Sequence, residues 1–192
     1  MKEHAAFFKN FLRSPFHVGA ITPSSSALVH TMLDWFDWTN ARAVVEFGPG
    51  SGVFTQGIIN GLQPEAKFFA IERSAEMVKA TRRRCPGVTV YEDTVTNVAD
   101  LCRRESISQV NAVISGLPWA SFTKQLQTEI MDAMFSVLVP GGQFATFAYL
   151  QGMMLPNARH FAESLEQRFA EVERSPIVWR NLPPAFVYRC VR

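Results

Sequence analysis

The chain has 192 residues, with 19 Lys and Arg against 17 Asp and Glu, and its formal net charge is +2. Hydrophobic residues make up 47% and charged residues 19%, which is a globular composition. Domains usually run to roughly 100–200 residues, so we expect a single domain over residues 1–192. Phosphate contacts need clustered Lys and Arg, and the near-neutral balance therefore argues against a protein that holds long nucleic acid by bulk charge.

The three cysteines, Cys85, Cys102 and Cys190, show neither C-x-x-C nor Cys/His ligand spacing. Their odd number predicts reduced thiols in a cytoplasmic protein, with neither a disulfide framework nor a metal site. Residues 1–4 do not begin the basic and apolar regions of a signal peptide. No uninterrupted apolar stretch approaches the roughly 18 residues that span a bilayer, so any membrane contact is expected to be peripheral.

Residues 3–13 predict an amphipathic helix that places Phe7, Phe8, Phe11 and Leu12 on one face. Four bulky apolar groups with basic neighbours suit the surface of an anionic bilayer. Eleven residues are short for free interfacial binding, so a lid helix packed on its own domain is an equal alternative. The two roles are compatible.

A second helix is expected to follow a loop over residues 19–23. Thr22 is the expected N-cap, and Pro23 takes the first helical position. The apolar residues of this helix are Leu28, Val29, Met32, Leu33, Trp35 and Phe36.

Strands and helices alternate from residue 43 onward, which predicts an α/β fold with a parallel sheet covered by helices on both faces. Residues 172–180 and 184–191 predict two further strands, joined at 181–183, that form an antiparallel hairpin at one edge. The fold class is therefore a three-layer α/β/α arrangement around a seven-stranded, mostly parallel sheet. The other expected strands cover 43–47, 67–72, 88–91, 110–115 and 143–149, and a turn at residues 140–142 precedes the last of them. The expected helices cover the region from the glycine turn to about 62, 74–84, 100–104, 122–138 and 157–170.

A glycine-rich turn, Glu46-Phe47-Gly48-Pro49-Gly50-Ser51-Gly52, follows the first of these strands and opens a helix. Glycines permit tight backbone geometry and let a ligand come close to the main chain. The spacing is G-x-G-x-G, not the G-x-G-x-x-G of the dinucleotide fingerprint, and no phosphate-binding Lys is near. A ligand-binding turn is favoured over a merely structural one.

Two acids follow the next two strands. Glu72 ends the second strand, where a carboxylate can accept both hydroxyls of a ribose. Asp93 follows the third strand, where it can accept from an adenine amino group. Either acid alone is more often a solvated loop residue, but both lie at the carboxyl ends of consecutive strands, where α/β sheets bind ligands.

Together, these motifs resemble the cofactor-binding motifs of class I S-adenosylmethionine-dependent methyltransferases. The resemblance spans nearly the whole chain, including the final antiparallel hairpin, and implies a Rossmann-like methyltransferase fold. It implies an enzyme with S-adenosyl-L-methionine as cofactor and S-adenosyl-L-homocysteine as product. The residues expected to bind the cofactor are Thr22, Glu46, Gly48, Gly50, Gly52, Glu72, Arg73, Asp93, Thr94, Ser115 and Gly116.

A narrower resemblance links the chain to bacterial phospholipid N-methyltransferases, which methylate the amine of phosphatidylethanolamine. In that family the N-terminal helix is thought to lie on the membrane and cover the cofactor. The resemblance implies that residues 1–40 form a lid and acceptor region and that residues 41–192 hold the cofactor, at the inner face of the cell membrane. The segments that carry it are 11–15, 19–25, 85–90, 115–118 and 143–149.

The segment Gly116-Leu117-Pro118-Trp119 occupies the place of the N-L-P-Y/F motif of ribosomal RNA adenine dimethyltransferases, which the sequence also resembles at the superfamily level. There, the Asn accepts from the adenine amino group and the aromatic residue stacks on the flipped base. Gly116 has no side-chain acceptor, and the chain has no room for an added RNA-binding domain. Leu117, Pro118 and Trp119 are instead expected at the substrate, where Trp119 flanks an amine by cation–π contact or simply covers the pocket.

Three further residues are candidates for handling the acceptor. Tyr149, at the end of the fifth strand, can orient an amine through its hydroxyl, or it is a core aromatic with a wet tip. His17, in the loop before Gly19, is an alternative catalytic base. Arg180 can hold a lipid phosphate bidentately, or it covers the surface of the hairpin.

The sequence thus predicts N-methylation of an amino-phospholipid, such as phosphatidylethanolamine, at the membrane surface. The N-terminal 40 residues and the terminal hairpin are expected to select the acceptor. The alternatives are a small-molecule N- or O-methyltransferase of secondary metabolism, an RNA adenine methyltransferase, and a non-catalytic domain that only binds the cofactor.

Overall fold

The computed structural model describes residues 24–192. The first described helix, α2 (Ser26–Leu33), begins after Ser25, whose hydroxyl accepts from the Leu28 amide and caps the helix. Helix α2 thus contains Leu28, Met32 and Leu33 of the helix expected after the loop of residues 19–23. The expectations for residues 3–13, His17 and Thr22 lie outside the described residues.

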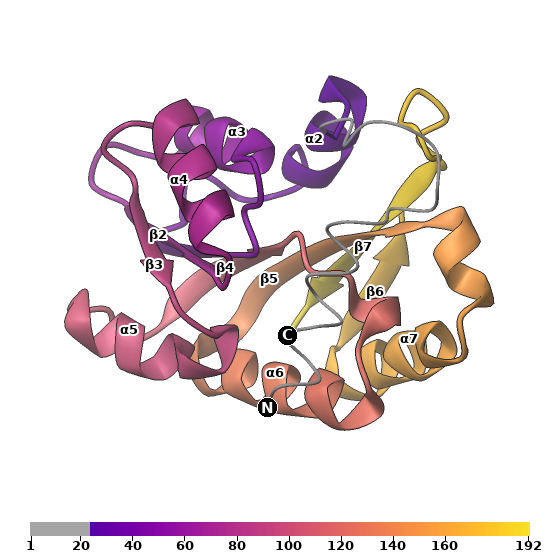
Figure 1. Ribbon diagram of the computed structural model, residues 1–192. Helices are drawn as coiled ribbons and strands as arrows, with labels where there is room; N and C mark the ends of the chain where they lie inside the picture. The colour runs from indigo at the N-terminus through magenta and orange to yellow at the C-terminus, as the bar shows by residue number, and fades with distance from the viewer. Residues whose placement is uncertain (1–23) are drawn as a thin grey trace.

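Seven strands form one sheet in the order β3-β2-β1-β4-β5-β7-β6. The five strands from β3 to β5 are parallel, whereas β7 runs antiparallel to both of its neighbours (Figure 1). This arrangement confirms the predicted mostly parallel sheet with its antiparallel hairpin. The strands are β1 (Ala43–Phe47), β2 (Lys67–Glu72), β3 (Thr89–Glu92), β4 (Val110–Ser115), β5 (Leu138–Tyr149), β6 (Glu171–Arg174) and β7 (Ala185–Val191).

Helices cover both faces of this sheet, which gives the three predicted layers (Figure 1). α2, α3 (Val53–Gly61) and α4 (Ala75–Arg84) lie on one face, and α5 (Val98–Arg104), α6 (Lys124–Val137) and α7 (Pro156–Arg168) lie on the other. Every residue of β1 is buried, because a central parallel strand is covered on both sides. The part of the chain that the structure describes also contains three 3₁₀ helices, η1 (Val95–Asn97), η2 (Trp119–Ser121) and η3 (Leu150–Met154).

Two segments differ from the sequence-based expectation. Residues 140–142, predicted as a turn before β5, lie within that strand, where a register shift against β4 absorbs them. The strand predicted over residues 172–180 ends at Arg174. Prolines 176, 183 and 184 lack the amide hydrogens that a continuous ladder needs, so residues 175–184 form a loop held to β7 by the Val178–Ala185 bridge.

The C-terminal ends of β1 to β5 meet along one side of the sheet, which we call the carboxyl edge. Ala185, the first residue of β7, pairs with Tyr149, the last residue of β5. The loop of residues 175–184 therefore lies at the carboxyl edge as well. Among residues 24–192, no helix combines the length and the apolar character that crossing a bilayer requires.

Candidate active site

The glycine turn after β1 forms the centre of the carboxyl edge. Gly48, Gly50 and Gly52 have φ values of +69°, +57° and +80°, a left-handed conformation that favours glycine. A Cβ atom on Gly50 would meet no heavy atom within 4 Å, so the turn has open space on that side. The backbone conformation therefore leaves room for a ligand to approach Gly50, and binding of the cofactor there stays a prediction.

Helix α4 holds this turn in place through two side chains. The Thr81 hydroxyl donates to the Gly50 carbonyl over 2.8 Å, and the Arg84 Nε donates to the Ser51 carbonyl over 2.7 Å. Sequence reasoning missed both residues, because more than thirty residues separate them from their partners. No local pattern could have revealed this pairing.

Glu72, at the end of β2, lies directly beside the turn. Its side chain is 4% exposed, and its two carboxylate oxygens accept from the amides of Gly50 (3.2 Å) and Ser74 (2.9 Å). Burial raises the pKa of this carboxyl, and the backbone hydrogen bonds oppose that rise. Each carboxylate oxygen keeps a lone pair, so Glu72 can still accept from a pair of ligand hydroxyls.

Glu46 lies deeper, in the middle of the sheet. It is fully buried, and its Oε2 accepts from the Thr55 hydroxyl of α3 over 2.6 Å. Burial, with a smaller contribution from Glu72, raises the pKa of Glu46 to about 8 against a lowering by the Thr55 hydrogen bond. Glu46 is thus mainly uncharged at neutral pH and ties α3 to β1; it is not among the residues that line the cavity described below.

This raised pKa predicts a pH-dependent stability. A carboxyl whose pKa is higher in the folded than in the unfolded state stabilises the fold at low pH, and this contribution disappears as pH rises through the folded pKa. We expect the free energy of unfolding of the unliganded protein to fall between pH 5 and pH 8 by about 3 kcal/mol on account of Glu46. Glu46→Gln, which keeps an oxygen for Thr55, should remove this component of the fall.

Chemical denaturation of both proteins at pH 5 and pH 8 measures the effect, and the difference between them cancels other titrating groups. If the free energy of unfolding falls by the same amount between pH 5 and pH 8 in wild type and in Glu46→Gln, the assignment of a buried neutral carboxyl is contradicted.

A cavity of about 490 Å³ opens at the carboxyl edge. Five residues of the predicted site line it, namely Gly48, Glu72, Arg73, Thr94 and Leu117. Most of the remaining lining is apolar, so a polar end at Glu72 adjoins a surface that suits a purine ring. The lining residues that sequence reasoning missed are Ile71, Val95, Ala120, Ser121, Phe122, Thr123, Leu126, Ile130, Leu155, Pro156 and Asn157.

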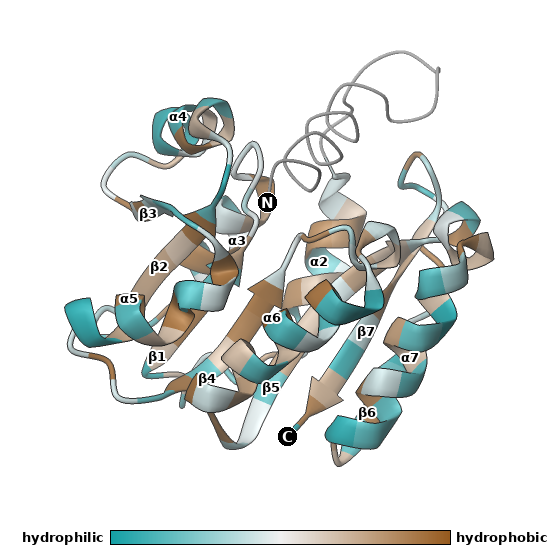
Figure 2. Ribbon diagram, turned by 60° about the horizontal axis from the view of Figure 1, so that its bottom comes forward, coloured by the Kyte–Doolittle hydropathy of each residue, from teal (hydrophilic) through white to brown (hydrophobic). Residues whose placement is uncertain are grey.

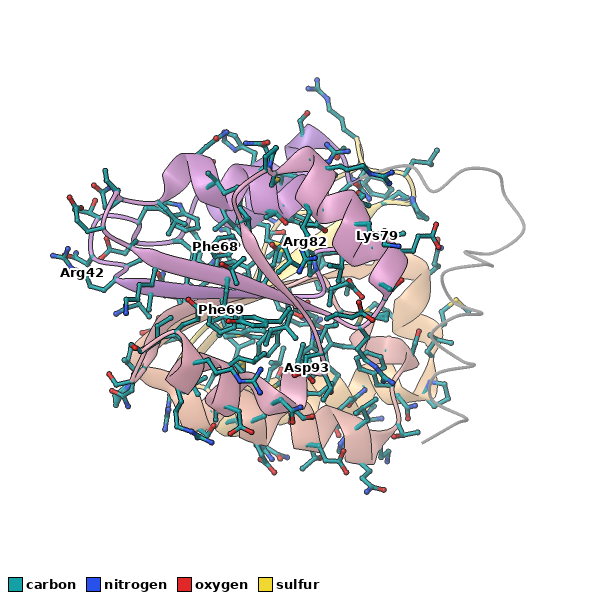
Figure 3. The ribbon with its side chains drawn as sticks, turned by 60° about the vertical axis from the view of Figure 1, so that its left-hand side comes forward. Arg42, Phe68, Phe69, Lys79, Arg82 and Asp93 are labelled. Atoms are coloured by element: carbon teal, nitrogen blue, oxygen red, sulfur yellow. The ribbon has the colours of Figure 1, made fainter. Side chains whose placement is uncertain are left out.

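Asp93 lies next to this cavity but is not one of its lining residues. Its amide donates to the Glu72 carbonyl over 3.1 Å, which fixes the end of β3 beside the end of β2. Its Oδ1 accepts from the Thr94 amide (2.7 Å) and from Asn97 Nδ2 (2.8 Å), and Figure 3 shows the residue at the turn that follows β3. The neighbouring residue Thr94 reaches the cavity, whereas contact of Asp93 with an adenine remains a prediction.

The segment after β4 is held by a buried network. The Ser115 hydroxyl accepts from the Leu117 amide (3.3 Å) and from the Trp119 indole Nε1 (3.0 Å). Trp119 is only 3% exposed and stacks on Phe161 with 4.7 Å between the ring centroids. The structure therefore buries the side chains of Ser115 and Trp119, and contact of Ser115 with the cofactor and of Trp119 with the acceptor stays a prediction. They position Leu117, which does line the cavity, whereas Pro118 precedes η2 without lining it.

Gln127 completes this network and was missed from the sequence. Its Nε2 donates to the carbonyls of Trp119 (2.8 Å) and Asn157 (3.1 Å), so it joins η2 to the start of α7. A signal was present: Gln127 begins the buried face of α6 that continues with Ile130, Met131 and Met134. A lone amide on an apolar stripe usually bonds to backbone, because a buried polar group needs a partner.

Gly116 makes the closest backbone approach in the site. A Cβ atom there would lie 2.5 Å from the Gly48 carbonyl oxygen, a distance that no side chain tolerates. The Gly116 amide also donates to the Phe47 carbonyl over 2.8 Å, which joins this segment to the glycine turn. The Asn of the RNA-methylating motif therefore has no space at this position.

Tyr149 and Arg180, the described candidates for contact with the acceptor, lie on adjoining segments of the carboxyl edge. The half-buried ring of Tyr149 packs edge-on against Phe147, with 5.3 Å between centroids, on the face of the sheet covered by α2 and α3. Burial raises the pKa of its phenol, so the hydroxyl stays protonated at neutral pH and can orient an amine without acting as an anion. Arg180 is exposed on the loop of residues 175–184.

Comparisons with known proteins identify the family of the chain. Residues 44–142 match the family model described as "Methyltransferase domain". The chain is 30% identical to the ornithine lipid N-methyltransferase of Singulisphaera acidiphila over 99% of its own length and 96% of that protein.

Solved structures with low identity share the fold. The O-methyltransferase from Bacillus cereus in complex with SAH aligns with a TM-score of 0.67 at 14% identity, over 99% of this chain and 90% of that one. The N-methyltransferase NodS from Bradyrhizobium japonicum aligns with a TM-score of 0.60 at 13% identity, over 99% and 96% of the two chains.

The sheet order, the open space at Gly50 and the Glu72 carboxylate beside it fit the cofactor that this family uses. The protein is an enzyme with S-adenosylmethionine as its cofactor, and the chain belongs to the class I S-adenosylmethionine-dependent methyltransferases.

Proposed function

We propose that the enzyme transfers the methyl group to the amine of a membrane lipid. The observation that supports this most is the similarity to an ornithine lipid N-methyltransferase, which extends over 99% of the chain. It therefore includes the first 40 residues and the segment after β5, which lie outside the matched methyltransferase domain. Those are the regions expected to select the acceptor.

The reaction needs little covalent chemistry from the protein. When bound, the cofactor supplies a methyl group that its sulfonium already activates, so the enzyme mainly aligns an unprotonated amine with that group. Glu72 and the turn around Gly50 would fix the cofactor. Tyr149 would orient the amine through its protonated hydroxyl, and Arg180 would hold an anionic part of the lipid.

The N-terminal residues keep their expected roles in this proposal. Residues 1–40 would form the lid and acceptor region of one domain whose residues 41–192 hold the cofactor. The helix of residues 3–13 would contact the inner face of the cell membrane, Thr22 would contact the cofactor, and His17 would be an alternative base.

Methylation of an RNA adenine is disfavoured by a specific observation. The position that would carry the base-recognising Asn is Gly116, and the Gly48 carbonyl oxygen occupies the space that its side chain would need. The formal net charge of +2 also offers little general attraction to a polyanion.

Radiolabelled S-adenosylmethionine tests the proposal directly. The enzyme is incubated with phosphatidylcholine vesicles that carry either ornithine lipid or phosphatidylethanolamine, and in parallel with RNA and with a fraction of small metabolites. We expect label in the organic phase with at least one of the amine lipids. The matched control is the same lipid with its amine acetylated, which should take no label because its nitrogen is no longer nucleophilic. Label confined to RNA or to water-soluble metabolites would contradict the proposal.

A further inference from the structure

The exposed large hydrophobic side chains of residues 24–192 belong to two segments that adjoin at the carboxyl edge. All five lie in two short segments, η3 with the residue after it and the loop of residues 175–184. Met154 is 88% exposed, Leu182 76% and Trp179 70%. We call this set the apolar rim, and it comprises Met154, Leu155, Ile177, Trp179 and Leu182.

The two segments leave the sheet from neighbouring strands. Tyr149, which precedes η3, pairs with Ala185, which follows the loop. The Leu150 amide donates to the Pro184 carbonyl over 3.1 Å, so the two segments meet where they leave the carboxyl edge. Figure 1 shows the loop projecting beyond β7 near η3, and Figure 2 shows the same projection from another side.

The loop is fixed in a conformation that keeps its apolar residues outside. Buried Asn181 accepts from the Ser25 amide over 2.9 Å and donates to the Pro183 carbonyl over 2.7 Å. Trp179, two residues before Asn181, and Leu182, directly after it, are both exposed. Folded proteins usually bury Trp and Leu and expose Asn, so this inverted order needs a partner for the apolar side chains.

The rim continues into the cofactor cavity. Leu155 belongs to the rim and also lines the cavity with Pro156 and Asn157, whereas Glu72 and Arg73 line its polar end. A surface that covers the rim therefore lies beside the opening of the site, at the edge where methyl transfer takes place.

The chemistry of the rim fits a lipid bilayer. Trp is amphipathic and suits the boundary between acyl chains and headgroups, and Leu, Ile and Met suit the acyl chains. Exposed Arg180 stands next to Trp179 and can pair with a lipid phosphate while its neighbour inserts. A projecting loop tip with this pattern enters a fluid surface without requiring a complementary pocket.

We infer that the apolar rim inserts into the surface of an anionic membrane and turns the carboxyl edge toward the lipids. This inference rests on the proposed function, because a membrane-embedded acceptor gives that orientation its use. It adds a second contact, made by the end of the chain, to the helix expected in residues 3–13.

Vesicle sedimentation tests the inference with the full chain. Wild type should cosediment with vesicles of phosphatidylcholine and phosphatidylglycerol, and more weakly with phosphatidylcholine alone. The double variant Trp179→Ser/Leu182→Ser should partition at least about tenfold more weakly, because two apolar groups no longer insert. The matched control, Trp179→Phe/Leu182→Met, keeps the apolar character and should bind like wild type.

Brominated lipids give a second measurement that locates the contact. They should quench the tryptophan fluorescence of wild type, and the single variant Trp179→Phe should lose most of that quenching while it still binds vesicles. Transfer to a short-chain acceptor lipid that stays monomeric should continue in the double serine variant, which shows that its site is intact.

The outcomes separate this inference from the proposed function. Rim-dependent vesicle binding without methylation of any lipid would support the inference and reject the proposed function. Equal vesicle binding by wild type and the double serine variant would overturn the inference even if lipids are methylated. If wild type does not bind vesicles but forms a dimer that depends on Trp179 and Leu182, as measured by sedimentation velocity, the inference is overturned. The partner of the rim would then be a second copy of this chain.

Discussion

Glu72→Ala is expected to weaken binding of S-adenosylhomocysteine by about 100-fold or more. The variant removes a buried carboxylate that can accept from two ribose hydroxyls, and charge-assisted hydrogen bonds of this kind contribute about 1.5–3 kcal/mol each. It also leaves the Gly50 amide without the acceptor that it has at 3.2 Å, so the glycine turn loses a support. Isothermal titration calorimetry measures the affinity.

The matched control is Glu92→Ala. Glu92 occupies the equivalent register position on β3, directly paired with Glu72, but its side chain is exposed. We expect the affinity of Glu92→Ala for S-adenosylhomocysteine to stay within about twofold of wild type, because surface substitutions have small effects. Glu72→Gln, which keeps the size of the side chain, should lie between the two. Unchanged affinity in a folded Glu72→Ala protein would show that the ribose lies elsewhere.

Gly116→Ala is expected to lower both cofactor affinity and stability. The new Cβ would lie 2.5 Å from the Gly48 carbonyl oxygen, which is backbone and cannot rotate away. Either the glycine turn or the segment after β4 must move, and such overpacking costs about 1–3 kcal/mol of unfolding free energy. We expect a loss of affinity of about tenfold or more, measured by the same titration, and Gly116→Asn should be worse.

Gly152→Ala is the control for this substitution. A Cβ atom on Gly152 meets no heavy atom within 4 Å, and its φ is not in the left-handed region. This variant should retain the affinity and stability of wild type. A Gly116→Asn protein that gains RNA methylation would contradict the argument that the site has no space for a base-recognising side chain.

The elements that the sequence predicted best are those with a simple periodic pattern. The bounds of β1, β2 and β4 match the prediction, because short, mainly apolar runs between turn residues have few alternative structures. The prediction of a turn at residues 140–142 was wrong. A proline and two glycines usually end a strand, and only the pairing with β4 shows that a register shift keeps them within β5.

The candidate site was predictable where side chains belong to strand ends. Gly50 and Glu72 could be paired from sequence, because parallel strands end at a common edge. The burial of Ser115 and Trp119 was not predictable, since whether a loop aromatic points to solvent or to the core depends on partners such as Phe161, far along the chain. The hydrogen bonds of Thr81 and Arg84 to the glycine turn could not be predicted for the same reason.

The attachment of α2 to the end of the chain has a consequence for the order of assembly during synthesis. Arg189 of β7 donates to the Thr31 carbonyl over 2.7 Å, and Asn181 accepts from the Ser25 amide. The strands and turns that form most of the cofactor site leave the ribosome long before these partners do. α2 can make these contacts only after residue 189 has been synthesised, so the corner that carries the apolar rim is completed later than the strands β1 to β4. The apolar side chains of the loop at residues 175–184 are thus made after the glycine turn and Glu72.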